Sequence, residues 1–155
     1  MTTSALILVV AGVGAVVYEQ LNGNIKGVPI FGGGTEKPDR FGRTPINILV
    51  IGSDTRSSAA DCKLGGDCGG GPGNADVEMI LHVSADRSNA TVMSVPRDTV
   101  AQIPACKDPS TGQTVPPQTT IINSALAYGP ACQVAAVHQL TGIPIDHFMM
   151  VDFGG

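Results

Sequence analysis

Residues 46–54 read INILVIGSD, an aliphatic run interrupted only by Asn47 that closes on glycine, serine and aspartate. A continuous apolar run of this length is typical of a strand buried on both faces, as in a parallel or mixed sheet. In α/β proteins, ligands bind beyond the carboxyl ends of such strands. The run therefore predicts an α/β fold, and it places Asp54 where a ligand would bind.

Two later segments repeat this arrangement of charge beside a strand. Asp76 opens the apolar run 77–84, and Arg97 with Asp98 directly follows the alternating run 90–95. A polar turn between the two runs predicts a β-hairpin. If all three strands are neighbours, these charged groups and the aspartate of the first strand share one edge of the sheet.

Carboxylates and guanidinium groups at one edge are the components of a metal-assisted phosphate site. The hard oxygens of Asp54 and Asp76 suit Mg²⁺, which takes substrate phosphate oxygens as further ligands. Arg97 and Arg56 can each clamp a phosphate bidentately. Any one of these residues also has an ordinary explanation, as a turn former or a solvated ion pair. Their combination favours phosphate chemistry.

The rest of the chain predicts two helices and a further strand. Helical spacing continues on both sides of a Gly-Pro pair within 119–140, with Pro130 in the first turn of the second helix. The apolar run 147–153 is typical of a strand. The proline-rich segment 97–118 is expected to form a surface excursion.

The chain begins with a membrane-type segment. Residues 5–18 are apolar or small and carry no charge, and with the preceding residues they reach the lower limit of about 17 for a spanning helix. No small-residue cleavage site follows, which favours an uncleaved anchor over 1–20 and a glycine-rich juxtamembrane linker over 21–44. A signal-peptide core and a buried helix are the alternatives.

Four cysteines, Cys62, Cys68, Cys106 and Cys132, lie in or beside two irregular loops. An even number in an extracytoplasmic setting predicts two disulfides. Pairing Cys62 with Cys68 and Cys106 with Cys132 would staple each loop. The alternative is a zinc site, although these spacings lack the paired C-x-x-C of common structural sites.

The charge of the chain argues against nucleic acid as a partner. The net charge is −4 and no basic run of five residues occurs. A nucleic-acid-binding protein normally carries a basic patch or stripe. We therefore expect no binding of DNA or RNA.

Taken together, the motifs resemble the LytR-CpsA-Psr family. They occur in the family's order along nearly the whole chain, and the cysteine-bearing loops are similar to an actinobacterial branch. The matching segments are LNGNI (21–25), NILVIGSDTR (47–56), AD (75–76), SVPRDT (94–99), INSALAYG (122–129) and LTGIPIDH (140–147).

The resemblance implies a transferase anchored in the cell membrane by one helix, with its domain outside the cytoplasm. Such enzymes move a glycopolymer of teichoic acid, capsule or arabinogalactan type from a polyprenyl-pyrophosphate carrier to peptidoglycan, forming a phosphodiester. The implied fold is a three-layer α/β/α sandwich with a mixed sheet and an apolar pocket for the lipid. A polyprenyl-pyrophosphate phosphatase and a non-catalytic polyprenyl-phosphate-binding remnant are the alternatives.

The resemblance also assigns roles to the charged residues. Asp54 and Asp76 match the carboxylates that hold Mg²⁺ or Mn²⁺. Arg97 matches an arginine that binds pyrophosphate, and Arg56 lies in the same pocket by motif. Asp98 is a candidate for orienting Arg97 or for accepting a proton.

The chain also departs from the family pattern. Asn74 and Ile121 replace an arginine and a lysine that are frequent in the family. Asn123, which lies inside a matching segment, is assigned to substrate binding. The family's domain continues beyond the position of Gly155 and supplies further arginines there. The resemblance therefore implies that 45–155 is the N-terminal part of a longer catalytic domain.

Overall fold

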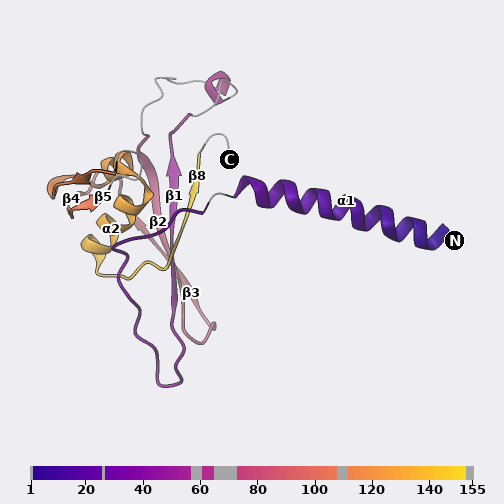
Figure 1. The fold of residues 1–155 in the computed structure, drawn as a ribbon. Coiled ribbons are helices and arrows are strands. Elements are labelled where there is room, and N and C mark those ends of the chain that lie inside the picture. Colours follow the sequence, from indigo (N-terminus) through magenta and orange to yellow (C-terminus); the bar gives the residue numbers. More distant parts are fainter. Residues whose placement is uncertain (1, 26, 57–60, 65–72, 108–111, 153–155) are drawn as a thin grey trace.

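The computed structural model describes residues 2–25, 27–56, 61–64, 73–107 and 112–152, and it confirms an α/β fold with a mixed sheet (Figure 1). The strand order is β3-β2-β1-β8. β2 pairs antiparallel with β1 and β3, and β8 pairs parallel with β1. The strands are β1 Ile46–Ser53, β2 Ala75–Val83, β3 Ala90–Val95 and β8 His147–Val151.

The segment expected to be an irregular excursion contains short strands. β4 (Val100–Ile103) pairs with β7 (Gln118–Ile121), and β5 (Cys106–Lys107) pairs with β6 (Thr114–Val115). Because β7 takes up residues 119–121, the first residues of the expected helix, that prediction was wrong over these three positions.

The helical layer follows β7. The 3₁₀-helix η2 (Ile122–Tyr128) leads through Gly129 into α2 (Pro130–Thr141), which begins at the predicted proline. The predicted Cys106–Cys132 disulfide is present and ties β5 to α2. Cys68 lies outside the described residues, and so does the predicted pairing with Cys62, which belongs to the 3₁₀-helix η1 (Asp61–Leu64).

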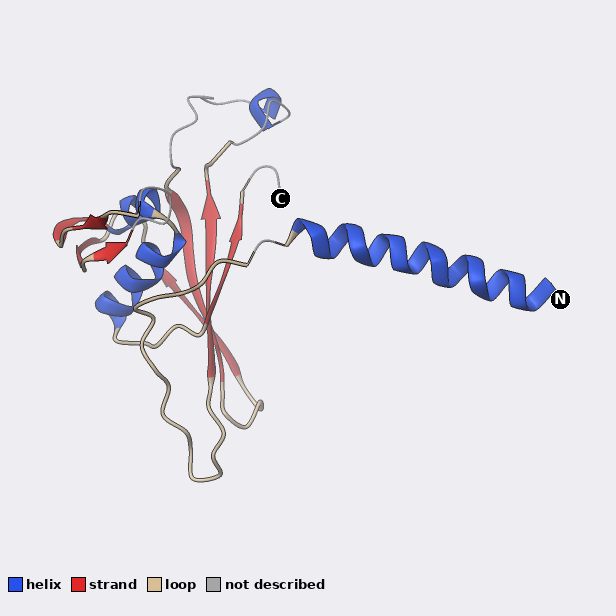
Figure 2. Cartoon of the chain, in the orientation of Figure 1, coloured by secondary structure: helices blue, strands red, loops and turns tan. Residues whose placement is uncertain are grey.

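The core lies between the helical layer and one face of the sheet (Figure 2). Along β1 the buried positions alternate with half-buried ones, so in the described part of the chain the strand is fully covered on one side. Apolar side chains on the other face remain exposed. The described residues therefore contain one of the two helical layers implied by the resemblance. The fully buried apolar side chains include Leu49, Ile51, Ile80, Ile122, Val134 and Val137; the exposed ones are Val77, Val92, Met149 and Val151.

The N-terminal helix α1 (Thr2–Asn24) contains the predicted membrane-type segment. Its stretch Ser4–Gly23 has the length and composition needed to cross a membrane, and none of it is buried. A signal sequence would satisfy the same criteria. The helix continues four residues into the predicted linker.

The remainder of the predicted linker packs against the domain. The buried Gly33 accepts a hydrogen bond from the Ile145 N–H at 2.6 Å, and Glu36 accepts one from the Asn47 side chain. Gly34 has a φ of +78°, and a Cβ there would lie 2.6 Å from the His138 ring. These glycines permit a close approach to α2 that fixes the path of the chain into β1.

Candidate functional site

The candidate site lies at the edge of the sheet where β1 ends. The register places Ser53, the last residue of β1, opposite Ala75, the first residue of β2. Asp54 and Asp76 each follow one of these two residues along the chain. The last residue of β3 pairs with β2 near the same edge, which brings Arg97 to it. The predicted convergence of three strand ends is thus confirmed.

Arg97 and Asp76 are joined by an ion pair. The Arg97 Nη1 donates to Asp76 Oδ1 at 2.6 Å, and Arg97 Nε lies 3.6 Å from Asp98 Oδ2. The bond to Asp76 and then the charges of both carboxylates raise the pKa of the guanidinium. The side chains of Arg97 and Asp76 are 54% and 38% exposed. An exposed pair of this kind contributes little to stability. Because about half of the Arg97 side chain is exposed, its guanidinium is accessible to a ligand.

Asp54 is held against the start of β2. Its Oδ1 accepts the Asn74 N–H at 2.7 Å, and its own N–H donates to the Asn74 carbonyl at 3.4 Å. Asn74 therefore positions the first carboxylate through its backbone, which does not depend on the side chain at that position. Arg56 lies two residues further along and is half-buried; its part in ligand binding stays a prediction.

Asn123 contacts the site through its backbone. Its N–H donates to the Arg97 carbonyl at 3.3 Å, and the Ile122 N–H donates to the Thr99 carbonyl at 2.8 Å. The Asn123 side chain is buried, and its Oδ1 has no partner in the described part of the chain. Asn123 thus holds the segment that carries Arg97, while the predicted contact with substrate remains untested.

Glu78 is a buried acid that the sequence reasoning did not assign. It lies two residues beyond Asp76 on β2, it is 1% exposed, and neither carboxylate oxygen has a hydrogen-bond partner among the described residues. Burial raises its pKa to about 7, and the neighbouring Gln133 side chain offsets part of that effect. The available signal was an acidic residue at an inward position of an apolar strand.

The acidic residues at this edge fit a sparsely coordinated hard cation. Within the described ranges there is no group of three or more His, Cys, Asp or Glu side chains that could hold a metal. Structural zinc needs such a group. Mg²⁺ instead binds through one or two carboxylates and substrate phosphates while it keeps several waters. Asp54 and Asp76 would supply such carboxylates, and Mg²⁺ binding there stays a prediction.

Comparison with known proteins gives consistent matches. The LytR_cpsA_psr family model matches residues 26–155. The probable cell wall biosynthesis protein LcpB of Corynebacterium glutamicum is 30% identical over 115 residues, which cover 70% of this chain and 24% of LcpB. The cell wall biosynthesis protein LcpA of the same organism is 29% identical, over 98% of this chain and 34% of LcpA.

A solved structure shares the fold. The crystal structure of B. subtilis TagV matches with a TM-score of 0.50 and 25% identity, over 71% of this chain and 37% of TagV. The chain thus spans between a quarter and about two fifths of the proteins it matches. Because the family model covers most of the chain, the protein belongs to the LytR-CpsA-Psr family.

Proposed function

We propose that this chain forms part of a transferase that moves a glycopolymer from a polyprenyl-pyrophosphate carrier to peptidoglycan. The domain works outside the cytoplasm, and α1 anchors it in the cell membrane. Family membership and the names of the two corynebacterial relatives support a role in cell wall assembly. The observation that carries the proposal is the ion pair between Arg97 and Asp76, beside Asp54, at the end of β1.

Arg97 binds the pyrophosphate in this mechanism. Its guanidinium presents several N–H groups in one plane, so it can donate to phosphate oxygens bidentately. Asp76 orients it through one carboxylate oxygen, and the backbone of Asn123 holds its carbonyl. Asp54 and the second oxygen of Asp76 would hold Mg²⁺ or Mn²⁺, which supplies positive charge against the pyrophosphate when bound.

The reaction is a displacement at phosphorus. A hydroxyl oxygen of peptidoglycan attacks the phosphorus that bears the glycopolymer and forms the new phosphodiester bond. The bond between that phosphorus and the bridging oxygen of the pyrophosphate breaks, and polyprenyl phosphate leaves with this oxygen and the electron pair of the bond. Asp98, whose carboxylate is exposed beside Arg97, is the group we assign to accept the hydroxyl proton. Catalysis of this kind depends mainly on positioning and charge neutralisation.

The test is a turnover assay on the full chain in neutral lipid nanodiscs, with a polyprenyl-pyrophosphate-linked oligosaccharide, peptidoglycan fragments and Mg²⁺. We expect release of polyprenyl phosphate that requires both Mg²⁺ and the fragments, and its loss in Arg97→Ala. Lys107→Ala, an exposed cation elsewhere, is the matched control. Release without fragments would indicate a phosphatase, and absence of release with retained lipid binding would indicate a non-catalytic binder.

A further inference from the structure

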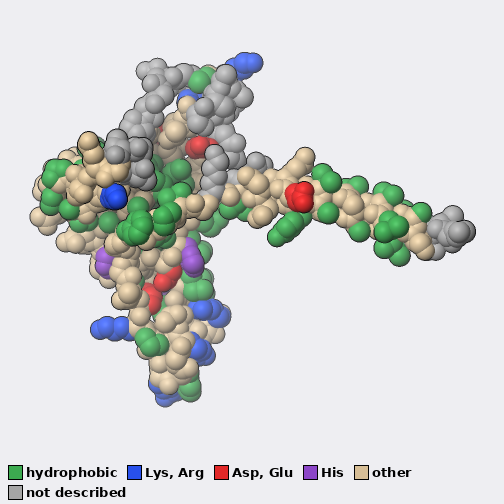
Figure 3. Space-filling model, viewed as in Figure 1, with side chains coloured by type: hydrophobic (Ala, Val, Ile, Leu, Met, Phe, Trp, Pro, Cys, Tyr) green, Lys and Arg blue, Asp and Glu red, His purple; other side chains and the backbone are tan. Residues whose placement is uncertain are grey.

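The end of the sheet opposite the candidate site carries a group of cations. They come from the loop before β1 and from the turn between β2 and β3, and Figure 3 shows Lys and Arg side chains at this end of the molecule. The group holds four of the nine Lys and Arg residues of a chain whose net charge is −4. We call Lys37, Arg40, Phe41, Arg43 and Arg87 the basic tip.

The loop of the basic tip is built around one carboxylate. Asp39 Oδ1 accepts the N–H groups of Phe41 and Arg43 at 2.7 and 3.0 Å, and its Oδ2 accepts Arg43 Nε and Nη2 at 3.0 and 2.8 Å. These bonds lower the pKa of Asp39. Gly42, with a φ of +77°, closes the turn. The loop is therefore ordered before a ligand arrives, which reduces the entropy lost on binding.

The turn between β2 and β3 is attached to this loop. Arg87 Nη1 donates to the Thr44 carbonyl at 3.1 Å and to the Ser84 carbonyl at 3.0 Å. The carboxylate of Asp86 is engaged by Ser84 and Ser88. Two segments far apart in the sequence thus present their cations on one surface. The nearby carboxylates of Asp39 and Asp86 accept hydrogen bonds from groups of the protein itself.

Two guanidinium groups lie over the aromatic ring of the tip. The Cζ atoms of Arg40 and Arg43 are 4.7 and 5.0 Å from the ring centroid of Phe41, a residue that is 65% exposed. A guanidinium stacked on a ring keeps its N–H edge free for phosphate or carboxylate. In the described part of the chain, no ion pair involves Lys37 or Arg40, so these two charges remain available.

The apolar content of the tip distinguishes between two anionic partners. Insertion into a lipid interface uses several free apolar side chains together with basic ones. Phe41 is the only large apolar side chain in 37–44, and the two guanidinium groups already contact its ring. The surface therefore fits a hydrated polyanion better than a membrane.

We propose that the basic tip docks an anionic glycopolymer that bears phosphodiester or uronate groups. The eight residues of β1 separate the tip from the pyrophosphate site by roughly 26 Å, so a polymer of several repeats can reach both. The inference rests on the proposed function in that the polymer is the one transferred. Among the polymer types considered above it favours the acidic ones, and it adds a second point of attachment.

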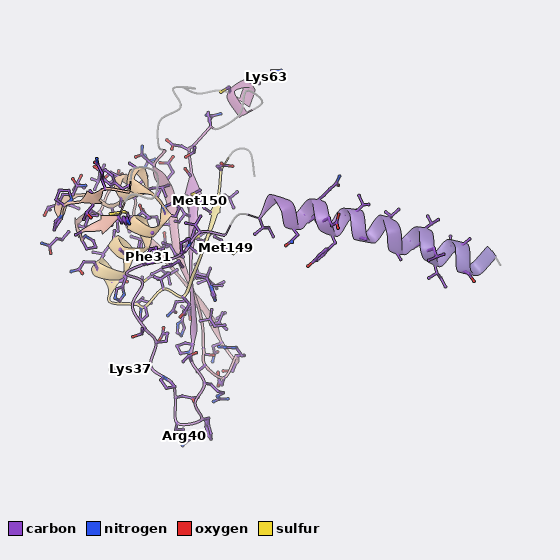
Figure 4. The ribbon with its side chains drawn as sticks, in the orientation of Figure 1. Phe31, Lys37, Arg40, Lys63, Met149 and Met150 are labelled. Carbon is purple, nitrogen blue, oxygen red and sulfur yellow. A yellow bond between two sulfur atoms is a disulfide. The ribbon has the colours of Figure 1, made fainter. Side chains whose placement is uncertain are left out.

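The experiment measures binding of poly(glycerol phosphate) to the full chain in phosphatidylcholine nanodiscs at low salt. Lys37→Gln/Arg40→Gln removes the two unpaired charges and retains the Asp39–Arg43 bonds. Lys63→Gln/Lys107→Gln is the matched control, because it removes the same charge from exposed positions elsewhere; Figure 4 shows Lys63 at the opposite end from Lys37 and Arg40. Neutral dextran is the ligand control.

We expect the tip variant to raise the Kd by about tenfold, equivalent to about 1.4 kcal/mol, and the matched control to bind like the unsubstituted chain. The difference should shrink at high salt, because salt screens exposed charges. Equal losses in the two variants, or no loss in the tip variant, would overturn the proposal. So would a tip that binds phosphatidylglycerol nanodiscs but not the polymer.

The same preparation separates this inference from the proposed function. Polymer binding that depends on the tip, without any transfer to peptidoglycan, would count against the transferase and leave the docking site standing. Transfer to peptidoglycan, with a tip variant that binds the polymer as tightly as the unsubstituted chain, would support the transferase and overturn the docking site. Circular dichroism of both variants confirms that they fold, as expected for substitutions at exposed positions.

Discussion

In the proposed site, Asp76 has two tasks that use different oxygens of one carboxylate. One oxygen accepts the 2.6 Å bond from Arg97, and an ionised carboxylate has a second oxygen that can bind a cation. The pairing fixes the orientation of the arginine at little energetic gain, since both side chains are partly exposed. We therefore expect Asp76 to matter more for pyrophosphate binding than for stability.

Glu78 gives a prediction for stability against pH. Its pKa is about 7 in the folded chain against an ordinary value of 4.5, so between these values the unfolded state loses a proton that the folded state keeps. The free energy of unfolding should therefore fall as pH rises from about 4.5 to 7, by about 3 kcal/mol. Denaturant titrations at several pH values measure this.

The control variants isolate the buried carboxyl. Glu78→Gln cannot ionise, so its unfolding free energy should change less across this window than that of the unsubstituted chain. Asp98→Asn, at an exposed carboxylate, should leave the slope intact. The same slope with Glu78→Gln would show that Glu78 is not responsible.

At the scale of elements, the glycines at 32–34 allow the segment between α1 and β1 to pack closely against α2. Gly34 has a φ of +78°, which L side chains rarely adopt, and an added Cβ would press on His138. Gly34→Ala should therefore lower the free energy of unfolding by about 1–3 kcal/mol. Thermal or denaturant unfolding of the full chain measures it.

Gly27 supplies the matched control for this substitution. It lies in the same segment, and a Cβ there would meet nothing within 4 Å. Gly27→Ala should change stability by no more than a few tenths of a kcal/mol. Equal effects of the two substitutions would mean that the segment is a free spacer.

The sequence predicted the elements whose signal is local. The aliphatic run of β1, the hairpin of β2 and β3, and the proline that begins α2 each carry their own pattern. β7 was missed because its pairing partner, β4, is remote in sequence, and short polar strands lack a strong period. The glycines of 32–34 were assigned to a juxtamembrane linker, since nothing in the sequence shows the helix they approach.

The site was predictable in part for the same reason. Charged residues at strand ends predict an edge with Asp54, Asp76 and Arg97. The ion pair itself depends on the register between β2 and β3 and on the bulge near Ser53, which a single sequence does not determine. Glu78 becomes evident only when its burial is known.

At the scale of the whole molecule, the sheet separates the two regions that we propose to bind anions. The edge with Arg97 lies at one end of β1, and the basic tip lies at the other. The chain spans 24% and 34% of the two corynebacterial relatives. The central claim is that the edge described here binds the pyrophosphate of the carrier.

The most direct measurement is a ³¹P NMR titration of octaprenyl pyrophosphate with the full chain in neutral nanodiscs, with and without Mg²⁺. We expect a change in the pyrophosphate resonances that requires Mg²⁺ and is lost or much weakened in Arg97→Ala and Asp76→Asn, with Lys107→Ala unaffected. Resonances that change equally in all variants, or not at all with the unsubstituted chain, would contradict the assignment of this edge as the pyrophosphate site.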